Sequence, residues 1–284
     1  MLNNQDGDGL KSDLLDLPLA RNCMTAAQRE QYHQIESKAI ETFDRLTRLN
    51  PNFETIVGKA PIKYANEVMV EFHRYLTYAD SFAVTFPLPE GLYPDTVFQK
   101  AQRVLEKCPR NAILLSLGDD DFYPILYLQQ HSHLRTDVRL INRNLIGIDR
   151  FIYMAGQPQF QSQPVRLSVT AAAYEGTTNN FLFLKDRPLA MPFSEVLDTL
   201  QKGQLDENGG RTLPGKEFIL RRGPGPDTVH FRETTYYIVK TDWVLPDILN
   251  NLRGRRLACE TLLGDSLVPL NAYFVQADDD LWVY

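Results

Sequence analysis

Three consecutive aspartates, Asp119, Asp120 and Asp121, are the side chains in this sequence best suited to chemistry. They follow Gly118, which ends the apolar run 112–117. Adjacent carboxylates repel one another unless a cation, a hydrogen-bond donor or the positive end of a helix offsets their charge. Magnesium and calcium prefer such hard oxygen ligands. The cluster therefore predicts a Mg or Ca site, with Asp119 and Asp121 as the metal ligands.

The same acids also have a structural interpretation. One of them would cap a helix that begins here, with Pro124 in its first turn, while the other two would face water. The sequence offers no partner ligand at a distance from the cluster, which favours the helix cap and leaves the metal site as the alternative.

Few other residues carry chemistry. His131 and His133 are two residues apart in an expected loop, where a solvated surface explains them more simply than chelation. His73 lies beside the apolar face of an expected helix, as a packed boundary residue does. The sequence contains no nucleophile elbow, zinc-protease helix or phosphate-loop motif, so the commonest hydrolase and nucleotide-binding signatures are excluded.

Aromatic residues are concentrated between Phe122 and Tyr127 and again toward the C-terminus. The C-terminal group comprises Tyr236, Tyr237, Trp243, Tyr273, Phe274, Trp282 and Tyr284. Tyrosine and tryptophan at a sheet edge can stack on sugar rings or anchor a protein partner, so carbohydrate is a candidate ligand. Core packing is the simpler explanation for most of these side chains.

The composition is that of a globular protein. The chain has 284 residues, of which 43% are apolar and 23% charged, and a chain of this length can bury a core without metal or disulfides. The formal net charge of -6 argues against a nucleic-acid partner, although Arg253, Arg255 and Arg256 are close enough in sequence to form a local basic patch. The odd number of cysteines favours free thiols in a reducing compartment.

The N-terminus lacks the basic start and apolar core of a secretory signal. No stretch approaches the roughly 18 apolar residues that a membrane-spanning helix requires. We therefore expect a chain without membrane spans that resides in the cytoplasm. The alternative is a periplasmic or envelope-associated protein from which a signal or an upstream membrane region has been removed.

The elements that must position these residues begin with helices. We interpret residues 1–24 as a polar tail, residues 25–93 as a helical N-terminal segment and residues 94–284 as an α/β domain. Thr25 is a helix cap, and apolar residues recur every three or four positions after it. A second helix is predicted over residues 61–79, so the two form an antiparallel helical hairpin.

The α/β domain is predicted from three adjacent segments. The apolar run 112–117 is typical of a strand buried on both faces, residues 122–130 indicate a helix, and residues 137–142 indicate a second strand. A strand, a helix and a strand at this spacing imply a right-handed parallel crossover. The predicted fold class is α/β, or α+β, with a mixed sheet.

Further elements follow the same patterns of periodicity and turn residues. They are a linker over 80–94, a helix over 94–107, strands over 165–169, 181–184 and 235–240, helices over 193–202 and 245–252, a polar connector over 203–215, a turn-rich loop over 222–226, and a closing hairpin of 271–276 with 281–284.

Two stretches resemble a known family. Residues 111–124, NAILLSLGDDDFYP, with Tyr127 and Gln129 after them, and residues 135–142, RTDVRLIN, are similar to two motifs of large multi-spanning bacterial membrane proteins. Those proteins are related to an animal O-mannosyltransferase-like transmembrane family, and the motifs lie in their soluble C-terminal domain. The similarity runs from about residue 98 to the C-terminus. It departs from the family pattern where Asp120 replaces an Asn and Phe122 replaces a Thr.

The resemblance implies a fold and a role that faces sugar or protein. Transferase chemistry is expected in the membrane region of that family, which this chain lacks, so the resemblance does not carry catalysis here. The ligand-binding candidates, with Asp120 added from the acidic cluster, are Asp119, Asp120, Asp121, Tyr127, Arg135, Asp137 and Asn142. Structural roles compete with binding, because Arg135 and Asp137 can form a local ion pair before the second strand and Asn142 can end it.

We therefore expect a non-enzymatic accessory or binding module, within a cell-envelope or glycan-related assembly, that contacts a protein partner through its helical segment. The missing catalytic motifs, the missing membrane spans and the helical extension motivate this hypothesis. The alternative is a divalent-metal-dependent or sugar-binding enzyme that uses the Asp119–Asp121 cluster. A third interpretation is a fragment of a larger envelope protein.

Overall fold

The computed structural model describes residues 23–78, 87–185, 190–207, 210–222, 225–230, 236–259, 275–278 and 281–283. Their helices are α2 (Ala26–Leu49), α3 (Ala60–Tyr78), α4 (Asp95–Lys107), α5 (Asp119–His131), α6 (Asp149–Ala155), α7 (Ala171–Tyr174), α8 (Phe193–Lys202) and α9 (Lys240–Asn250). Their strands are β1 (Glu54–Thr55), β2 (Gly58–Lys59), β3 (Ile113–Ser116), β4 (Arg139–Asn142), β5 (Phe181–Leu184), β6 (Ala190–Pro192), β7 (Arg211–Leu213), β8 (Glu217–Arg222), β9 (Gly225–His230), β10 (Tyr237–Val239), β11 (Leu257–Cys259), β12 (Val275–Asp278) and β13 (Leu281–Val283).

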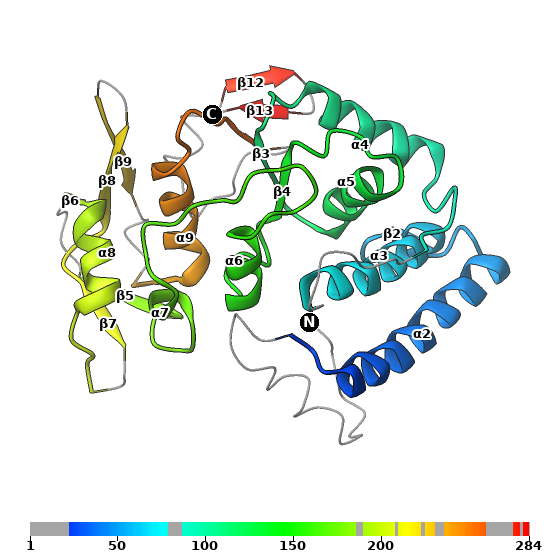
Figure 1. Ribbon diagram of the computed structural model, residues 1–284, viewed down its shortest axis with the longest axis horizontal. Coiled ribbons are helices and arrows are strands. Elements are labelled where there is room, and N and C mark those ends of the chain that lie inside the picture. The colour runs from blue at the N-terminus through cyan, green and yellow to red at the C-terminus, as the bar shows by residue number, and fades with distance from the viewer. Residues whose placement is uncertain are drawn as a thin grey trace.

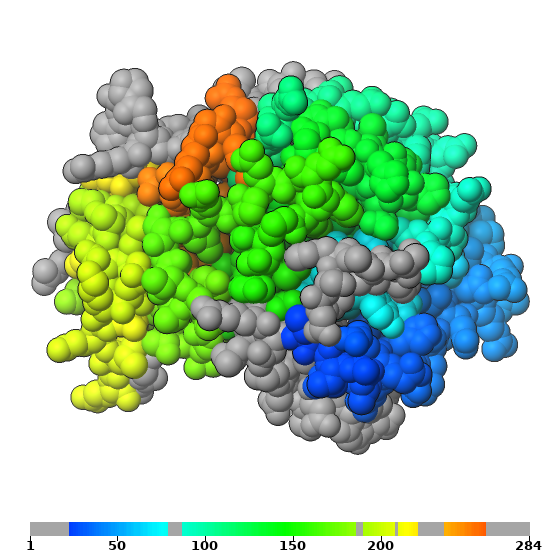
Figure 2. All heavy atoms as spheres, in the orientation of Figure 1, coloured from blue at the N-terminus to red at the C-terminus, as the bar shows by residue number. Residues whose placement is uncertain are grey.

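The elements follow one another across the molecule in layers (Figure 1). The helical pair α2 and α3 lies at one end, and α3 faces α5. The sheet that contains β3 and β4 lies in the middle. At the far end lie α8 and two three-stranded sheets, which have the strand orders β10-β5-β7 and β6-β8-β9. The space-filling view shows the helical pair and the far end separated by residues of the central layer (Figure 2).

The helical hairpin predicted at the N-terminus is confirmed. Thr25 caps α2 through a capping box, in which its hydroxyl accepts from the backbone N–H of Gln28 and the Gln28 side chain accepts from the Thr25 N–H at 2.9 Å. The short β1–β2 hairpin connects α2 to α3. On α3, Met69 and Phe72 are buried in the same core as α4 and α5. The boundary predicted at residue 93 stays a prediction, but this core extends across it.

The mixed sheet and its parallel crossover are also confirmed. A five-stranded sheet has the order β12-β13-β11-β3-β4, in which β3 pairs with β4 and with β11 in parallel and β13 pairs antiparallel. α5 connects β3 to β4. β3 lies between two neighbours, and all four of its residues are buried, as the run of apolar residues predicted. β4 is an edge strand of the same sheet.

Alternate residues of the parallel strands serve two cores, because successive side chains point to opposite faces of a sheet. Leu114, Leu140 and Ala258 pack in the core formed with α3, α4 and α5. Ile113 and Ile141 pack on the opposite face, in the core that contains α6, α8 and α9. Both faces of the sheet are therefore covered at β3, which explains why this strand is apolar without alternation.

The downstream predictions are partly correct. β5 and α8 have the predicted bounds, β10 lies within the predicted strand, and β12 pairs antiparallel with β13 as the predicted closing hairpin requires. The predicted connector 203–215 contains β7, and the predicted loop 222–226 is entered by β8 and β9. Several predicted residues lie outside the described ones: residues 1–22 of the tail, residue 79 of the second helix, residues 80–86 of the linker, residues 208–209 of the connector, residues 223–224 of the loop, residue 235 of the strand, and residues 271–274, 279–280 and 284 of the hairpin.

Two predictions are wrong for a physical reason. Residues 165–169 form no strand, because the backbone N–H of Ser168 donates to the Asp247 carboxylate at 2.8 Å instead of to a neighbouring strand. The helix predicted from residue 245 begins five residues earlier, at Lys240, because the Asp242 carboxylate accepts from the backbone N–H of Val239 at 2.9 Å and caps the helix there. In the part of the chain that the structure describes, no helix has the length and apolar character needed to cross a membrane.

Candidate functional site

The three acids form the first turn of α5. The helix begins at Asp119, with Gly118 as the residue before it, so the predicted start at Phe122 was three residues late. Asp119 and Asp120 are exposed and Asp121 is half-buried. Carboxylates in a first helical turn are stabilised by the positive end of the helix dipole. This placement agrees with the structural interpretation in part, since no side chain makes the cap hydrogen bond.

Two of the carboxylates already have partners. Asp121 forms an ion pair with Lys100 of α4 at 2.9 Å, and Asp120 accepts from the Asn66 side-chain amide of α3 at 3.3 Å. The Asn66 oxygen in turn accepts from the hydroxyl of Tyr93 at 2.8 Å. Burial raises the pKa of Asp120, and the neighbouring charges of Asp121 and Asp119 raise it further. The acids therefore join α5 to α3 and α4.

The described side chains next to the acids include a cation and an amide donor. Among the described residues, no group of three or more His, Cys, Asp and Glu side chains is arranged to hold a metal ion. The depression beside Asp120 and Asp121 has a volume of only about 10 Å³ and includes the ammonium-bearing Lys100. A lysine cation and an amide donor on the carboxylates compete with a divalent ion for the same oxygens.

Tyr127 lies in the middle of α5 with its ring in the core. Its hydroxyl donates to the carbonyl of Pro89 at 2.8 Å, and its ring stacks on His131 with centroids 4.9 Å apart. Burial raises its pKa. The hydroxyl thus holds the segment that enters α4. His131 and His133 are exposed, and His73 is buried among aromatic rings that include Phe122.

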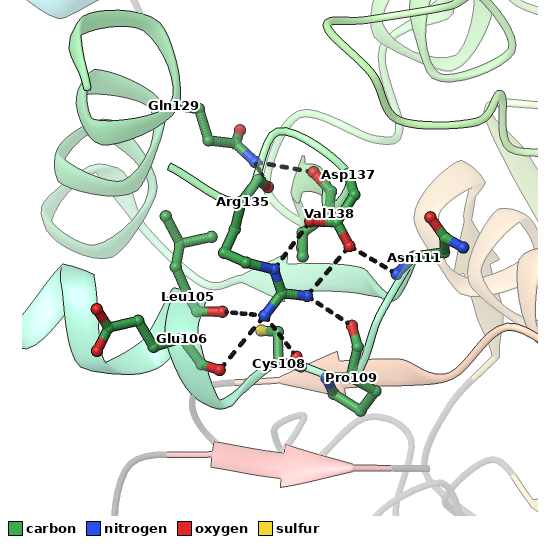
Figure 3. A network of polar contacts seen from close by, with 9 residues as sticks. All are labelled: Leu105, Glu106, Cys108, Pro109, Asn111, Gln129, Arg135, Asp137 and Val138. Atoms are coloured by element: carbon green, nitrogen blue, oxygen red, sulfur yellow. Dashed lines mark hydrogen bonds and ion pairs between the residues drawn. The ribbon is translucent and has the colours of Figure 1, made fainter. Parts of the chain in front are cut away.

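Arg135 and Asp137 form an ion pair in the turn before β4 (Figure 3). The Arg135 guanidinium donates to both Asp137 oxygens, at 2.8 and 3.1 Å. Its remaining N–H groups donate to backbone carbonyls at the end of α4 and just after it, those of Leu105, Glu106, Cys108 and Pro109, at 2.8–3.3 Å. The guanidinium therefore satisfies carbonyl groups that the last turn of a helix leaves without partners.

The same turn is held from two further sides. Asp137 accepts from the backbone N–H of Asn111 at 2.8 Å, which ties the start of β3 to the start of β4. Gln129 of α5 donates from its amide to the carbonyls of Arg135 and Val138, at 3.1 and 2.8 Å (Figure 3). Arg135 adopts a positive φ of 44°, which is uncommon for a non-glycine residue and is stabilised here by these contacts. The Arg135 hydrogen bond to Asp137 lowers the pKa of that carboxyl.

Asn142 is the last residue of β4 and is buried. Its side-chain oxygen accepts from the backbone N–H of Asn144 at 3.0 Å, so it ends the strand as one of the two interpretations predicted. Its side-chain nitrogen has no hydrogen-bond partner. Asn144 donates in turn to the carbonyl of Leu117 at 2.7 Å, close to the start of α5.

The candidate residues do not form one site. α5 runs from the carboxyl end of β3 to the amino end of the parallel strand β4. The acids and the Arg135–Asp137 pair therefore lie at opposite ends of these two strands. Asn142, the last residue of β4, lies at the same end of the strands as the acids. Tyr127 lies between the two ends and points into the core.

The structure also shows buried polar residues that the sequence did not identify. Lys240 is 4% exposed, forms an ion pair with Asp149 and donates to the carbonyl of Tyr174 at 2.6 Å. Asp247 is fully buried and accepts from Asn251 at 2.9 Å, and burial raises its pKa. Arg139 is buried at the start of β4. A charged residue inside an otherwise apolar stretch was the only signal for any of them.

The aromatic group of the C-terminal half divides in two. Trp243 is fully buried, as core packing predicts, while Tyr236 and Tyr237 are 67% and 50% exposed. Tyr273, Phe274 and Tyr284 lie outside the described residues, and the side chain of Trp282 is not described.

Comparison with known proteins matches part of the chain to a family model. Residues 98–220 match the family model of TMEM260-associated domain 2, which indicates a relation to the TMEM260 family. The match contains β3, α5 and β4, and with them all the ligand-binding candidates from Asp119 to Asn142. The helical pair lies outside it. No curated protein and no solved structure matches the chain.

Proposed function

We propose that this chain is a non-enzymatic accessory or binding module that contacts a protein partner through the tip of its helical pair. One observation carries the proposal. Between the end of α2 and the start of α3, Leu49, Phe53 and Ile56 are 73%, 48% and 99% exposed. Scattered exposed apolar residues are ordinary, but three within eight residues at the connection of two helices favour an interaction surface.

The roles of the motif residues support a module without catalysis. Arg135, Asp137 and Gln129 make hydrogen bonds that join α4, α5, β3 and β4, so their donors and acceptors are engaged inside the protein. A catalytic group needs a polar atom that is available to substrate. We propose that these residues are retained for the architecture of the domain that the helical pair extends.

The alternative, a divalent-metal-dependent or sugar-binding enzyme, has less support. Lys100 and Asn66 are bonded to two carboxylates of the cluster, which favours a helix start over a metal site. For a carbohydrate ligand, the exposed rings of Tyr236 and Tyr237 would be the stacking surface. Binding of labelled oligosaccharides that persists unchanged after Tyr237→Ala would contradict that version.

The assembly and the compartment are part of the proposal. A glycan-related or cell-envelope assembly is proposed from the resemblance of residues 111–124 and 135–142, which lie within the stretch 98–220 that matches TMEM260-associated domain 2. The cytoplasm is our proposed compartment, because the odd number of cysteines in the sequence favours a reducing compartment. Immunoblotting of cytoplasmic, periplasmic and membrane fractions tests this, and recovery in the periplasm would favour the alternative location.

The tip is tested by Ile56→Asp in the full chain. We expect cross-linking followed by affinity purification from native cells to recover a partner with the wild type, and the variant to lose at least tenfold of the binding to that purified partner. A charge in a desolvated apolar contact leaves an unpaired ion there. Leu205→Asp is the matched control, because Leu205 is 51% exposed on the connector after α8 and should bind as the wild type does.

Two outcomes would contradict the proposal. One is equal binding by Ile56→Asp and the wild type. The other is a wild-type chain that is monomeric and recovers no partner after cross-linking in cells.

A further inference from the structure

A small cavity lies beside the outer edge of β4. It has a volume of about 40 Å³ and is lined by residues of β4, α3 and α6, among them His73, Thr77, Arg139, Asn142 and Ala155. One water needs about 10–15 Å³ of such cavity volume. The cavity therefore has room for roughly three waters, or for one small ion with water beside it.

Two buried side chains on this cavity have N–H groups without partners. Arg139 and Asn142 are 3% and 4% exposed. Among the residues that the structure describes, neither the Arg139 Nε nor the Asn142 Nδ2 has a hydrogen-bond partner. A buried donor without an acceptor costs about 1–3 kcal/mol, so an occupant of the cavity that accepts hydrogen bonds would be stabilising.

The charge of Arg139 favours an anion over water alone. Its two terminal nitrogens donate to the backbone carbonyls of Gln157 and Met154, which are neutral. Among the described residues, no carboxylate forms an ion pair with Arg139. Burial lowers the pKa of Arg139 to about 9, and the nearby cation of Arg255 adds to that effect. A buried cation without a counter-ion is unfavourable, and an anion in the cavity would offset it.

The other residues of the cavity are compatible with an anion. Burial lowers the pKa of His73 to about 3, so its ring is neutral at physiological pH and adds no second titrating charge. Thr77 and Ala155 are small, and Phe151 closes one side with an apolar ring. None of the described residues that line the cavity is acidic, so no carboxylate among them repels a negative charge.

We propose that this cavity is a binding site for one small anion, of the size of chloride or a single carboxylate group, held against the guanidinium of Arg139. Water beside the anion reaches the side-chain amide of Asn142. The anion would join α6, whose last carbonyls Arg139 holds, to the edge of the central sheet. The site is independent of the tip of the helical pair and of the acids of α5.

The first test is thermal unfolding of the full chain at constant ionic strength, with sodium gluconate replaced stepwise by chloride, bromide or formate. Gluconate is too large for a cavity of about 40 Å³. A bound anion stabilises the folded state in proportion to the logarithm of its concentration above the dissociation constant. We expect Tm to rise with each small anion relative to gluconate. Equal Tm values in all four salts would overturn the proposal.

Two variants separate binding from general salt effects. Arg139→Met removes the charge, and Ala155→Ile fills the cavity while Arg139 stays in place. Both should lose the rise in Tm on replacement of gluconate, whereas Arg256→Met, which changes an exposed arginine, should keep it. An unchanged rise in Ala155→Ile would overturn the proposal even if Arg139→Met fails to fold.

The location is tested by anomalous diffraction from wild-type crystals soaked in sodium bromide. A bromide peak within hydrogen-bond distance of the Arg139 Nε is the expected result. Density for water alone at a bromide concentration that saturates the thermal effect would overturn the proposal. A response to formate without one to the halides would identify the carboxylate as the ligand chemistry.

Discussion

At the scale of single residues, two carboxylates from the two family-like stretches have pKa values shifted in opposite directions. Burial and two like charges raise the pKa of Asp120, whereas an arginine lowers the pKa of Asp137. An acid with a raised folded pKa stabilises the fold below its unfolded pKa, and this stabilisation is lost as pH rises through the folded pKa. An acid with a lowered pKa contributes stability above its unfolded pKa, which is lost as pH falls.

Asp120→Asn is therefore predicted to raise the free energy of unfolding at pH 7. The neutral amide removes the repulsion with Asp119 and Asp121 and keeps an oxygen that can accept from Asn66. The gain should shrink as pH falls toward 4, because the wild-type carboxyl then becomes protonated. Urea unfolding between pH 3 and 8 measures it, with Asp121→Asn as the control that loses the ion pair to Lys100 and should not be stabilised.

Alanine variants of two of the acids test the metal alternative. We expect calorimetric titration of the wild type with magnesium, calcium and manganese to give no binding heat. Heat that disappears in Asp119→Ala and Asp121→Ala would instead support a metal site at the start of α5.

At the scale of elements, one side chain fixes the relation between a helix and a strand. Arg135 precedes β4 in sequence, yet four of its acceptors are carbonyls at or just after the end of α4. The planar guanidinium can serve several carbonyls and a carboxylate at once, which a lysine ammonium cannot do. Arg135 of the motif RTDV thus connects the end of α4 to the start of β4.

Arg135→Lys is predicted to lower the free energy of unfolding by about 2 kcal/mol or more, since hydrogen bonds to a charged group contribute roughly 1.5–3 kcal/mol each. Urea unfolding followed by circular dichroism measures the change. Arg256→Lys, at an exposed arginine, should change it by less than about 0.5 kcal/mol. Equal stabilities of Arg135→Lys and the wild type would show that the network is dispensable.

At the scale of the whole molecule, the helical pair is bound to the α/β domain through a shared core. Phe72 of α3 is 1% exposed and packs with residues of α4 and α5. The two cores meet across the central sheet, because alternate residues of β3 point to each of them. We therefore expect the described elements on both sides of the sheet to unfold together.

Phe72→Ala is predicted to destabilise the entire molecule by about 3–5 kcal/mol, the usual loss for a buried phenylalanine. Helix loss by circular dichroism and exposure of the buried Trp243, recorded in a Trp282→Phe background, should shift together to lower urea concentrations. If helix is lost early while the Trp243 transition stays in place, residues 25–93 unfold on their own and the predicted domain boundary is supported.

The sequence by itself determined the local elements of this protein. Thr25 and the periodicity after it specify α2, the run at residues 112–117 specifies a strand buried on both faces, and the strand–helix–strand spacing specifies the parallel crossover. These features depend on neighbours in the chain, whose propensities and periodicity can be read directly. The start of α5 was placed three residues late, because three adjacent acids are typical of a loop as well as of a first turn.

Only the tertiary structure decided what the polar residues do. The residues that bind the side chains of Asp120, Arg135 and Lys240 lie 26 to 91 residues away in the chain. The exceptions are Asp137, which pairs with the Arg135 side chain, and Gln129, which binds the Arg135 carbonyl. No pattern of spacing encodes such pairs, since folding brings them together through packing of whole elements. The same packing places the acids and the Arg135–Asp137 pair at opposite ends of β3 and β4. It also buries Arg139 and Asn142, whose Nε and Nδ2 have no partner among the described residues, beside a cavity.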